Sequence, residues 1–134
     1  FIAEPGCNGT FTVYGYGCPG TGGVTPALTG TGCPSPDRDF ALVLDDGFAG
    51  ETGWILLGTG TGVLPVKPGC DLQNIPLIAP YLVPLTLDGF GELFLAARLP
   101  VGTPTFDLYL QTLFADAGAA YGISATPPLA MHFQ

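Results

Sequence analysis

The residue types of nucleophilic catalysis are scarce in this sequence, which has one histidine, His132, and two serines. His132 takes an outward position in the last predicted strand. As a general base it would need an orienting carboxylate and a nucleophile beside it. Neither Ser35 nor Ser124 stands in the Gly-x-Ser-x-Gly pattern of a nucleophile elbow. We therefore expect a surface histidine, no catalytic residue and no enzymatic activity.

Acidic residues gather between positions 37 and 51, where carboxylates could bind calcium. Asp39 and Asp45 bracket a predicted strand and would lie roughly 20 Å apart, so one ion cannot use both. Asp45, Asp46 and Glu51 are separated only by a short loop and form the calcium candidate. The simpler interpretation is that these are solvated carboxylates in turns, which predicts no metal and no other cofactor.

Six aromatic side chains are candidates for stacking on a sugar ring: Trp54, Tyr14, Tyr16, Tyr81, Tyr109 and Tyr121. Trp54 begins an apolar run, which predicts a position in the core. Tyr109 lies on the outward face of a predicted strand, so we expect it to be the most exposed of the six. Asn8-Gly9-Thr10 has the form of a glycosylation sequon. Because Asn-Gly is also a common turn, both interpretations of Asn8 stay open.

Four cysteines in a chain of this length predict two disulfides and an oxidising compartment. None of the intervals between them has the C-x-x-C spacing of a zinc site. Three pairings are possible. We favour Cys18 with Cys70 and Cys7 with Cys33, because this pairing ties the glycine-rich stretch 14–35 to the rest of the chain and the N-terminal arm to that stretch.

The composition limits the partners that the protein can have. The chain has 134 residues, a net charge of -8 and only 10% charged residues, whereas about 25% is typical of soluble domains. Nucleic acids and anionic membranes both require a basic patch, so both are excluded as partners. No apolar run approaches the roughly 20 residues of a membrane span. A surface with so little charge suits coverage by partners, by glycan or by copies of the chain, and the alternative is a secreted domain with a neutral surface.

Alternation of apolar and polar residues predicts an all-β protein with about eight to ten strands and no amphipathic helix. The predicted strands include 10–16, 24–29, 39–45, 53–58, 81–87, 92–98, 105–115, 121–125 and 129–133. Pro68-Gly69 predicts a turn between the short segments 64–67 and 70–73. Asp88-Gly89 predicts a hairpin between 81–87 and 92–98. The pattern favours an antiparallel β-sandwich, of Ig-like or jelly-roll type, linked by disulfides.

The length predicts a single sandwich domain over residues 10–134, preceded by an arm at 1–9. The expected core consists of inward-facing apolar side chains from five of these strands. Its members are Phe40, Leu42, Leu44, Trp54, Leu56, Leu93, Leu95, Phe106, Leu108, Leu110, Leu129 and Met131.

Several glycine- and proline-containing motifs occur in a characteristic order: Tyr14 to Leu28, Gly32-Cys33-Pro34, Leu64-Pro65 with Pro68-Gly69-Cys70, Thr105 to Gln111, Asp116, and Gly122 to Thr126. In this order and spacing they resemble the C-terminal module of many large secreted proteins of environmental bacteria. The resemblance covers roughly residues 14–133. It implies an extracellular β-sandwich and supplies no catalytic residue. The chain differs from the usual pattern in standing alone and in the arm that carries Cys7.

These observations predict a secreted or cell-surface structural protein whose main partner is another copy of itself. We expect a subunit that assembles into a filament or surface layer by exchange of a strand or arm. The arm would use the apolar tip Phe1 and Ile2, followed by Phe11 and Val13 of the first strand. The alternative is a secreted glycan-binding or adhesion module.

Overall fold

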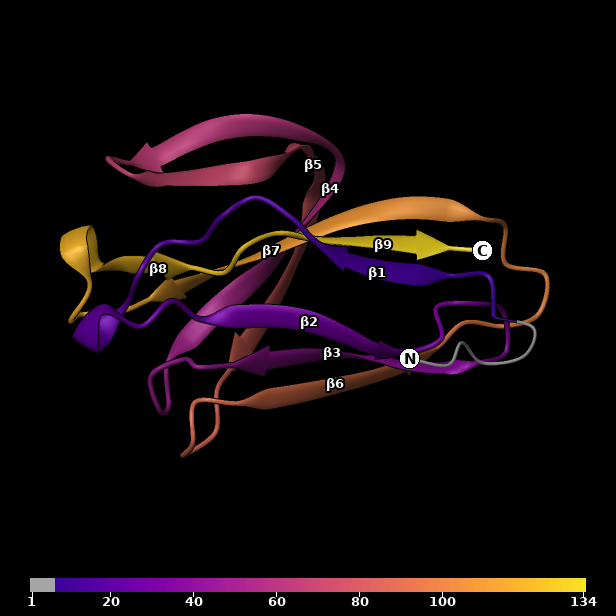
Figure 1. Ribbon diagram of the computed structural model, residues 1–134, viewed down its shortest axis with the longest axis horizontal. Coiled ribbons are helices and arrows are strands. Elements are labelled where there is room, and N and C mark those ends of the chain that lie inside the picture. Colours follow the sequence, from indigo (N-terminus) through magenta and orange to yellow (C-terminus); the bar gives the residue numbers. More distant parts are fainter. Residues whose placement is uncertain (1–6) are drawn as a thin grey trace.

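The computed structural model describes residues 7–134, with only the backbone described at 79–81 (Figure 1). The strands are β1 (Thr10–Val13), β2 (Ala27–Gly32), β3 (Asp39–Asp45), β4 (Thr52–Lys67), β5 (Cys70–Thr86), β6 (Leu93–Arg98), β7 (Phe106–Ala115), β8 (Ile123–Ala125) and β9 (Leu129–Phe133). Two 3-10 turns, η1 (Thr21–Gly23) and η2 (Ala120–Gly122), are the only helical segments in the described part of the chain.

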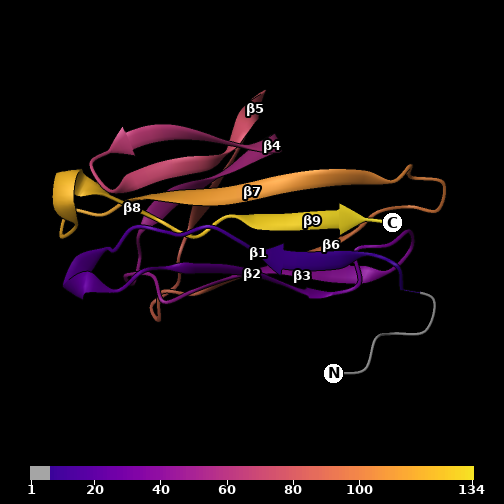
Figure 2. The same ribbon diagram turned by 45° about the horizontal axis from the view of Figure 1, so that its top comes forward.

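The strands form two antiparallel sheets. The larger sheet has six strands in the order β1-β9-β7-β4-β5, with β8 paired to the end of β7, and the smaller sheet has the order β2-β3-β6. Figure 2 shows the smaller sheet lying as a second layer beside the β7-β9-β1 part of the larger one. The prediction of a disulfide-linked antiparallel β-sandwich is therefore confirmed.

The hydrophobic core lies between the two sheets and is built by alternation, since every second side chain of a strand points inward. Its buried members are Leu28, Phe40, Leu44, Ile55, Leu85, Leu87, Leu110, Phe114, Leu129, Met131 and Phe133. Five predicted core residues are among them. Another five, Leu42, Leu93, Leu95, Phe106 and Leu108, are only half-buried at its margin. The smaller sheet therefore does not cover all of the inner face of the larger one.

The core prediction was wrong for Trp54, which is 42% exposed. The strand β4 alternates here, so Ile55 enters the core while Trp54 and Leu56 point to the outer face of the sheet. Leu56 is buried beside Gln111, its partner on β7. The apolar run therefore has two differently covered faces, and the sequence around Trp54 does not show which part of the outer face is covered.

The long β4-β5 hairpin covers part of the outer face by folding back over the sheet (Figures 1 and 2). It bends at Gly58, where the pairing of β4 with β7 ends and its register with β5 shifts. A Cβ at Gly58 would lie 1.7 Å from the Asn74 carbonyl oxygen, so only glycine fits the bend. The Gln73 amide N–H donates to the Gln111 side-chain carbonyl at 2.8 Å. The buried Asn74 amide donates to the Leu56 carbonyl oxygen at 2.9 Å. Buried amides thus hold the hairpin where apolar packing would otherwise be needed.

The predicted turn at Pro68-Gly69 is confirmed as the tip of this hairpin, with Lys67 and Cys70 paired across it. The predicted hairpin at Asp88-Gly89 was wrong. Strand β5 pairs with β4, and β6 pairs with β3. The Asp88 turn therefore carries the chain from one sheet to the other. Turn residues specify a sharp reversal, but they do not specify whether the flanking strands pair with each other.

Both favoured disulfides are confirmed, Cys7–Cys33 and Cys18–Cys70. The second one joins the tip of the β4-β5 hairpin to the glycine-rich segment. That segment is in turn bound to β8, because Cys18 and Ala125 exchange two backbone hydrogen bonds of 2.9 and 3.2 Å. The disulfide thus fixes the hairpin against the outer face of the sheet.

Two leucines on the same face of β7 test how far the core extends. Leu110 is buried and Leu108 is half-buried. We expect Leu110→Ala to lower the free energy of unfolding by about 2 to 5 kcal/mol, the usual cost of a buried cavity. The cost of Leu108→Ala should be clearly smaller, because water already reaches part of that side chain. Urea unfolding at low protein concentration measures both values. Equal losses of unfolding free energy would contradict the conclusion that the buried core ends between Leu110 and Leu108.

Candidate functional site

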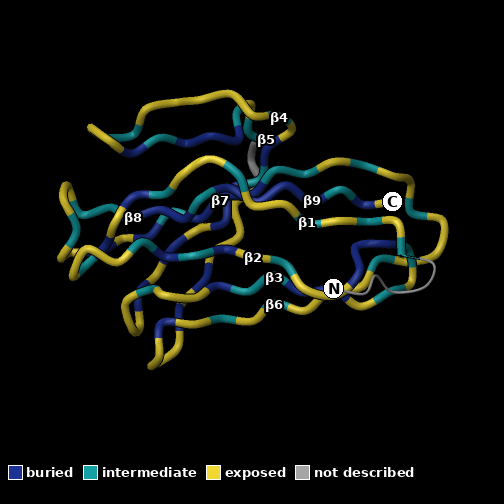
Figure 3. The backbone as a smooth tube through the Cα atoms, viewed as in Figure 1, coloured by how far each residue is buried: buried dark blue, intermediate teal, exposed yellow. Residues whose placement is uncertain are grey.

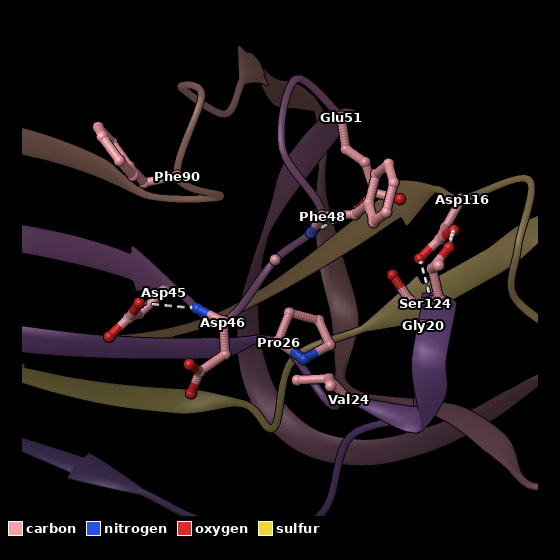
Figure 4. A pocket seen from close by; sticks show the side chains of 12 residues that line it. Gly20, Val24, Pro26, Asp45, Asp46, Phe48, Glu51, Phe90, Asp116 and Ser124 are labelled. Carbon is pink, nitrogen blue, oxygen red and sulfur yellow. Dashed lines mark hydrogen bonds between the residues drawn. The ribbon is translucent and has the colours of Figure 1, made fainter.

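A pocket of about 320 Å³ lies at the end of the sandwich where β3 and β7 finish (Figure 4). It is formed by the loop between β3 and β4, the η1 turn, the turn after β7, β8 and the turn before β6. Its polar lining consists of Thr21, Asp45, Asp46, Glu51, Asp116 and Ser124. The residues come from five separate parts of the chain, so only the assembled fold creates this site.

Glu51 and Asp116 face each other in the wall of the pocket and are only 8% and 3% exposed. Burial and the hydrogen bond and charge of Asp116 raise the pKa of Glu51 from 4.5 to about 7. Burial by itself would also raise the pKa of Asp116. Hydrogen bonds from Thr21, Glu51 and Gly118 outweigh that effect, so the pKa of Asp116 is lowered. The pair therefore holds one proton near neutral pH, and that proton resides on Glu51.

Asp116 also fixes the loops that shape the pocket. The backbone N–H of Thr21 donates to one of its carboxylate oxygens at 2.8 Å, and the hydroxyl of Thr21 donates to the other. The Gly118 N–H donates to the carboxylate at 3.0 Å. A single buried carboxylate thus binds the η1 turn and its own following turn. The sequence marked Asp116 only as a member of a motif, and its partners are far from it along the chain.

Ser124 contributes a hydroxyl group to the same wall. Its side chain is 1% exposed, and its Oγ has no hydrogen-bond partner. In Figure 4 this oxygen points toward the interior of the pocket, beside Gly20 and Asp116. At the mouth, Phe48 and Phe90 are 53% and 84% exposed. The pocket therefore combines carboxyl groups, one free hydroxyl and apolar rings at its entrance.

The structure brings all three residues of the calcium candidate, Asp45, Asp46 and Glu51, to this pocket. It does not place them as a set of metal ligands: among the described residues, no three His, Cys, Asp or Glu side chains are grouped so that they could hold a metal ion. Glu51 instead pairs with Asp116. Its carboxylate oxygen also accepts a hydrogen bond from the Phe48 N–H at 3.4 Å.

His132 has the orienting carboxylate that its position in the sequence did not show. Its Nδ1 lies 2.7 Å from the Asp107 carboxylate, which is its partner in the β7-β9 register. Both side chains stand on the outer face of the sheet and reach solvent. Because water competes there for both groups, we assign the pair no chemical role.

The aromatic candidates do not share one surface. Tyr14 and Tyr109 pack edge to face at 6.1 Å, and Tyr109 is half-buried, so the expectation that it is the most exposed was wrong. The Tyr14 hydroxyl donates to the Gln73 carbonyl oxygen at 3.0 Å, and Tyr16 donates to Asp71. Both tyrosines thus help to hold the β4-β5 hairpin. Tyr121 is the most exposed of those described, and the side chain of Tyr81 lies outside the described set.

The N-terminal candidates are only partly visible. Phe1 and Ile2 lie outside the described residues. Phe11 packs against the protein's own core beside Phe40, at 6.2 Å between rings, while Val13 is exposed. Asn8 is exposed too, so its glycosylation stays a prediction. Cys7 is bonded to Cys33, so the described part of the predicted arm 1–9 is linked covalently to the sandwich.

The two long sides of the sandwich differ. On the β1-β2 side the sheets touch, since a Cβ at Gly30 would lie 2.3 Å from the ring of Phe11. On the other side, the margin between β6 and the first half of β7 carries half-buried apolar residues, and Figure 3 colours parts of both strands as intermediate in burial. We call this margin the open side. We assign to it five of the partly buried residues that pack against the core: Leu42, Leu57, Leu95, Phe106 and Leu108.

Two strand edges border the open side. Strand β4 pairs with β7 only from Phe114 to Tyr109, so Phe106, Asp107 and Leu108 have no described partner on that edge. Strand β6 pairs with β3 alone in the described part of the chain. Backbone donors and acceptors on both edges are therefore available to another strand.

Comparison with protein-family models, with curated proteins and with solved structures found no match. The described part of the chain contains no helix that is long and apolar enough to span a membrane. The two disulfides indicate an oxidising environment.

The proton on Glu51 predicts a pH-dependent stability. Because the pKa of Glu51 is raised from 4.5 to about 7 on folding, the folded state binds more protons between these values. Stability should fall as the pH rises through this window, by at most about 3 kcal/mol. The lowered pKa of Asp116 has the opposite effect, since it makes stability fall as the pH falls. That effect is confined to pH values below its ordinary pKa of 3.8.

Glu51→Gln should remove the decline, since an amide keeps a neutral hydrogen-bonding group at every pH. Glu92→Gln serves as the matched control because Glu92 is exposed and lies outside the pocket. Urea unfolding between pH 4.5 and 7.5 gives the comparison. An identical slope in the wild type and in Glu51→Gln would show that Glu51 is not the titrating group.

Proposed function

We propose that the chain is an extracellular structural subunit that assembles head to tail. In this proposal, residues 1–6 of one copy fill the open side of the next copy. The observation that carries the proposal is the coincidence of two unpaired strand edges with half-buried apolar side chains between them. A short extended segment would pair with an edge and cover those side chains at the same time.

The length and tether of the arm favour insertion into a neighbour. Six extended residues span about 20 Å. The proposed arm is anchored at Cys7, which is bonded to Cys33, directly after β2. Strand β3 separates β2 from β6, so reaching its own open side would use about half of the arm for the crossing. The arm of a second copy makes no such detour.

The energetics agree with an association of this kind. Burial of Phe1 and Ile2 would contribute roughly 3 to 5 kcal/mol to the free energy of association. Backbone hydrogen bonds along the strand edge would fix the orientation of the bound arm. A contact that joins two different surfaces does not close on itself and so propagates as a fibre. Assembly would also account for the low charge of 10%, since neighbouring copies cover surface that charge would otherwise keep soluble.

The test uses separate variants for the arm that one copy inserts and for the open side that receives it. Deletion of residues 1–6 removes the arm but keeps Cys7 and its disulfide, so the sandwich should stay folded without assembling. Leu95→Arg places a charge in the open side and should also stop assembly. Val101→Arg adds the same charge at a 75% exposed loop residue and should assemble like the wild type. Near-ultraviolet circular dichroism checks the fold of each variant, and sedimentation with electron microscopy measures assembly.

A mixture of the two defective proteins gives the decisive result. The deletion variant keeps an intact open side, and Leu95→Arg keeps an intact arm. We therefore expect each to be monomeric alone and the mixture to form dimers of one copy of each. A monomeric wild type at high concentration, or polymers of the deletion variant, would overturn the proposal.

A further inference from the structure

The pocket at the end of the sandwich has a charge that its own residues do not balance. Asp45, Asp46, Glu51 and Asp116 line it, and no lysine, arginine or histidine does. Even with one proton on the Glu51–Asp116 pair, the lining is strongly negative at neutral pH. A concave site with one sign of charge concentrates ions of the other sign.

The hydroxyl group of Ser124 is an independent indication of a ligand. A buried polar atom without a hydrogen-bond partner costs free energy, and such atoms are rare in folded proteins. Three described side-chain atoms are of this kind, Asn74 Oδ1, Thr112 Oγ1 and Ser124 Oγ, and of the three residues only Ser124 lines the pocket. A ligand with an N–H or O–H group would supply the missing partner.

The residues that line the pocket favour an organic cation over a metal ion. Calcium binds six to eight oxygens at about 2.3 to 2.6 Å, whereas the oxygens of Asp116 already accept hydrogen bonds from Thr21 and Gly118. The exposed rings of Phe48 and Phe90 at the mouth offer faces for a carbon skeleton and for a cation. A volume of about 320 Å³ is sufficient for a small organic molecule.

We propose that this pocket binds a primary ammonium group carried on a carbon skeleton, as in an amino sugar or a lysine side chain. The ammonium group lies beside the Glu51–Asp116 pair and donates to Ser124 Oγ. The skeleton rests against Phe48 and extends toward Asp45 and Asp46, which Figure 4 shows on the opposite side of the pocket. This site is at the end where β3 finishes, whereas the Cys7–Cys33 tether of the arm is at the end where β3 begins, so the inference does not depend on assembly.

The proton on Glu51 gives the binding a pH dependence with a definite sign. Asp45, Asp46 and Asp116 are the other charged groups that line the pocket, and all three attract a cation. Since the pKa of Glu51 is about 7, its carboxyl is neutral in mild acid and ionised above neutrality. The affinity for an ammonium group should therefore rise between pH 5.5 and 8.

Titration of the full chain, followed by NMR, provides the test. Glucosamine is the amino-sugar probe, and N-acetylglucosamine, which lacks the charge, is its neutral control. Nα-acetyl-lysine amide represents the lysine source, so the two probes together distinguish a sugar from a peptide. Shifts of the Ser124 and Phe48 amides with glucosamine or the lysine probe, and none with N-acetylglucosamine, are the expected result.

Two variants complete the design. Asp46→Asn and Ser124→Ala should each weaken binding of the better probe by at least about fivefold without lowering the unfolding midpoint. Asp37→Asn is the matched control for Asp46, because both residues are exposed, both have φ of 57°, and Asp37 lies outside the pocket. Equal binding of the charged and neutral sugars, equal effects of Asp46→Asn and Asp37→Asn, or displacement of the amine by stoichiometric calcium would each overturn the proposal.

Discussion

The two sheets of this sandwich have different widths, and most of the structure follows from that difference. Three strands, β2, β3 and β6, face a sheet of six. Where they overlap, a core of leucine, phenylalanine and methionine side chains is buried. Where they do not, the larger sheet must be covered in another way or stay partly exposed. The β4-β5 hairpin covers part of the outer face, and the margin between β6 and β7 stays open.

Hydrogen bonds from buried polar groups hold parts of this structure together where a wider sandwich would use apolar packing. Gln111 and Asn74 are fully buried, and their amides hold the hairpin to the sheet. Asp116 holds the glycine-rich η1 turn in the same manner. An unpaired buried polar group is costly, and Asn74 Oδ1, Thr112 Oγ1 and Ser124 Oγ are the three described side-chain atoms of this kind. Of the three residues, only Ser124 lines the pocket that we assign to an ammonium ligand.

The tether of the proposed arm and the pocket lie at opposite ends of β3. The arm leaves the sandwich near Cys33, where β3 begins, and the pocket lies beyond Asp45, where β3 ends. A strand of this length separates them by roughly 20 Å. In an assembly formed through the open side, the pocket of each copy is not needed for the contact. A polymer of the proposed kind would present the same ligand site many times and so combine the structural and the binding functions.

Local patterns in the sequence determined several of the strands, because alternation and turn residues act over a few neighbouring positions, but they did not show that β4 (Thr52–Lys67) and β5 (Cys70–Thr86) are long and continuous. The predicted ranges 39–45 and 129–133 coincide with β3 and β9, and the favoured cysteine pairing is the one observed. Tertiary structure alone decided which strands became neighbours, since pairing joins residues far apart in sequence. Tertiary structure made the Asp88 turn a connection between the two sheets. It also left Trp54 exposed and placed Asp107 beside His132. It also brought Glu51 to Asp116, because the pKa of a carboxyl depends on burial and on charges that only the folded chain assembles.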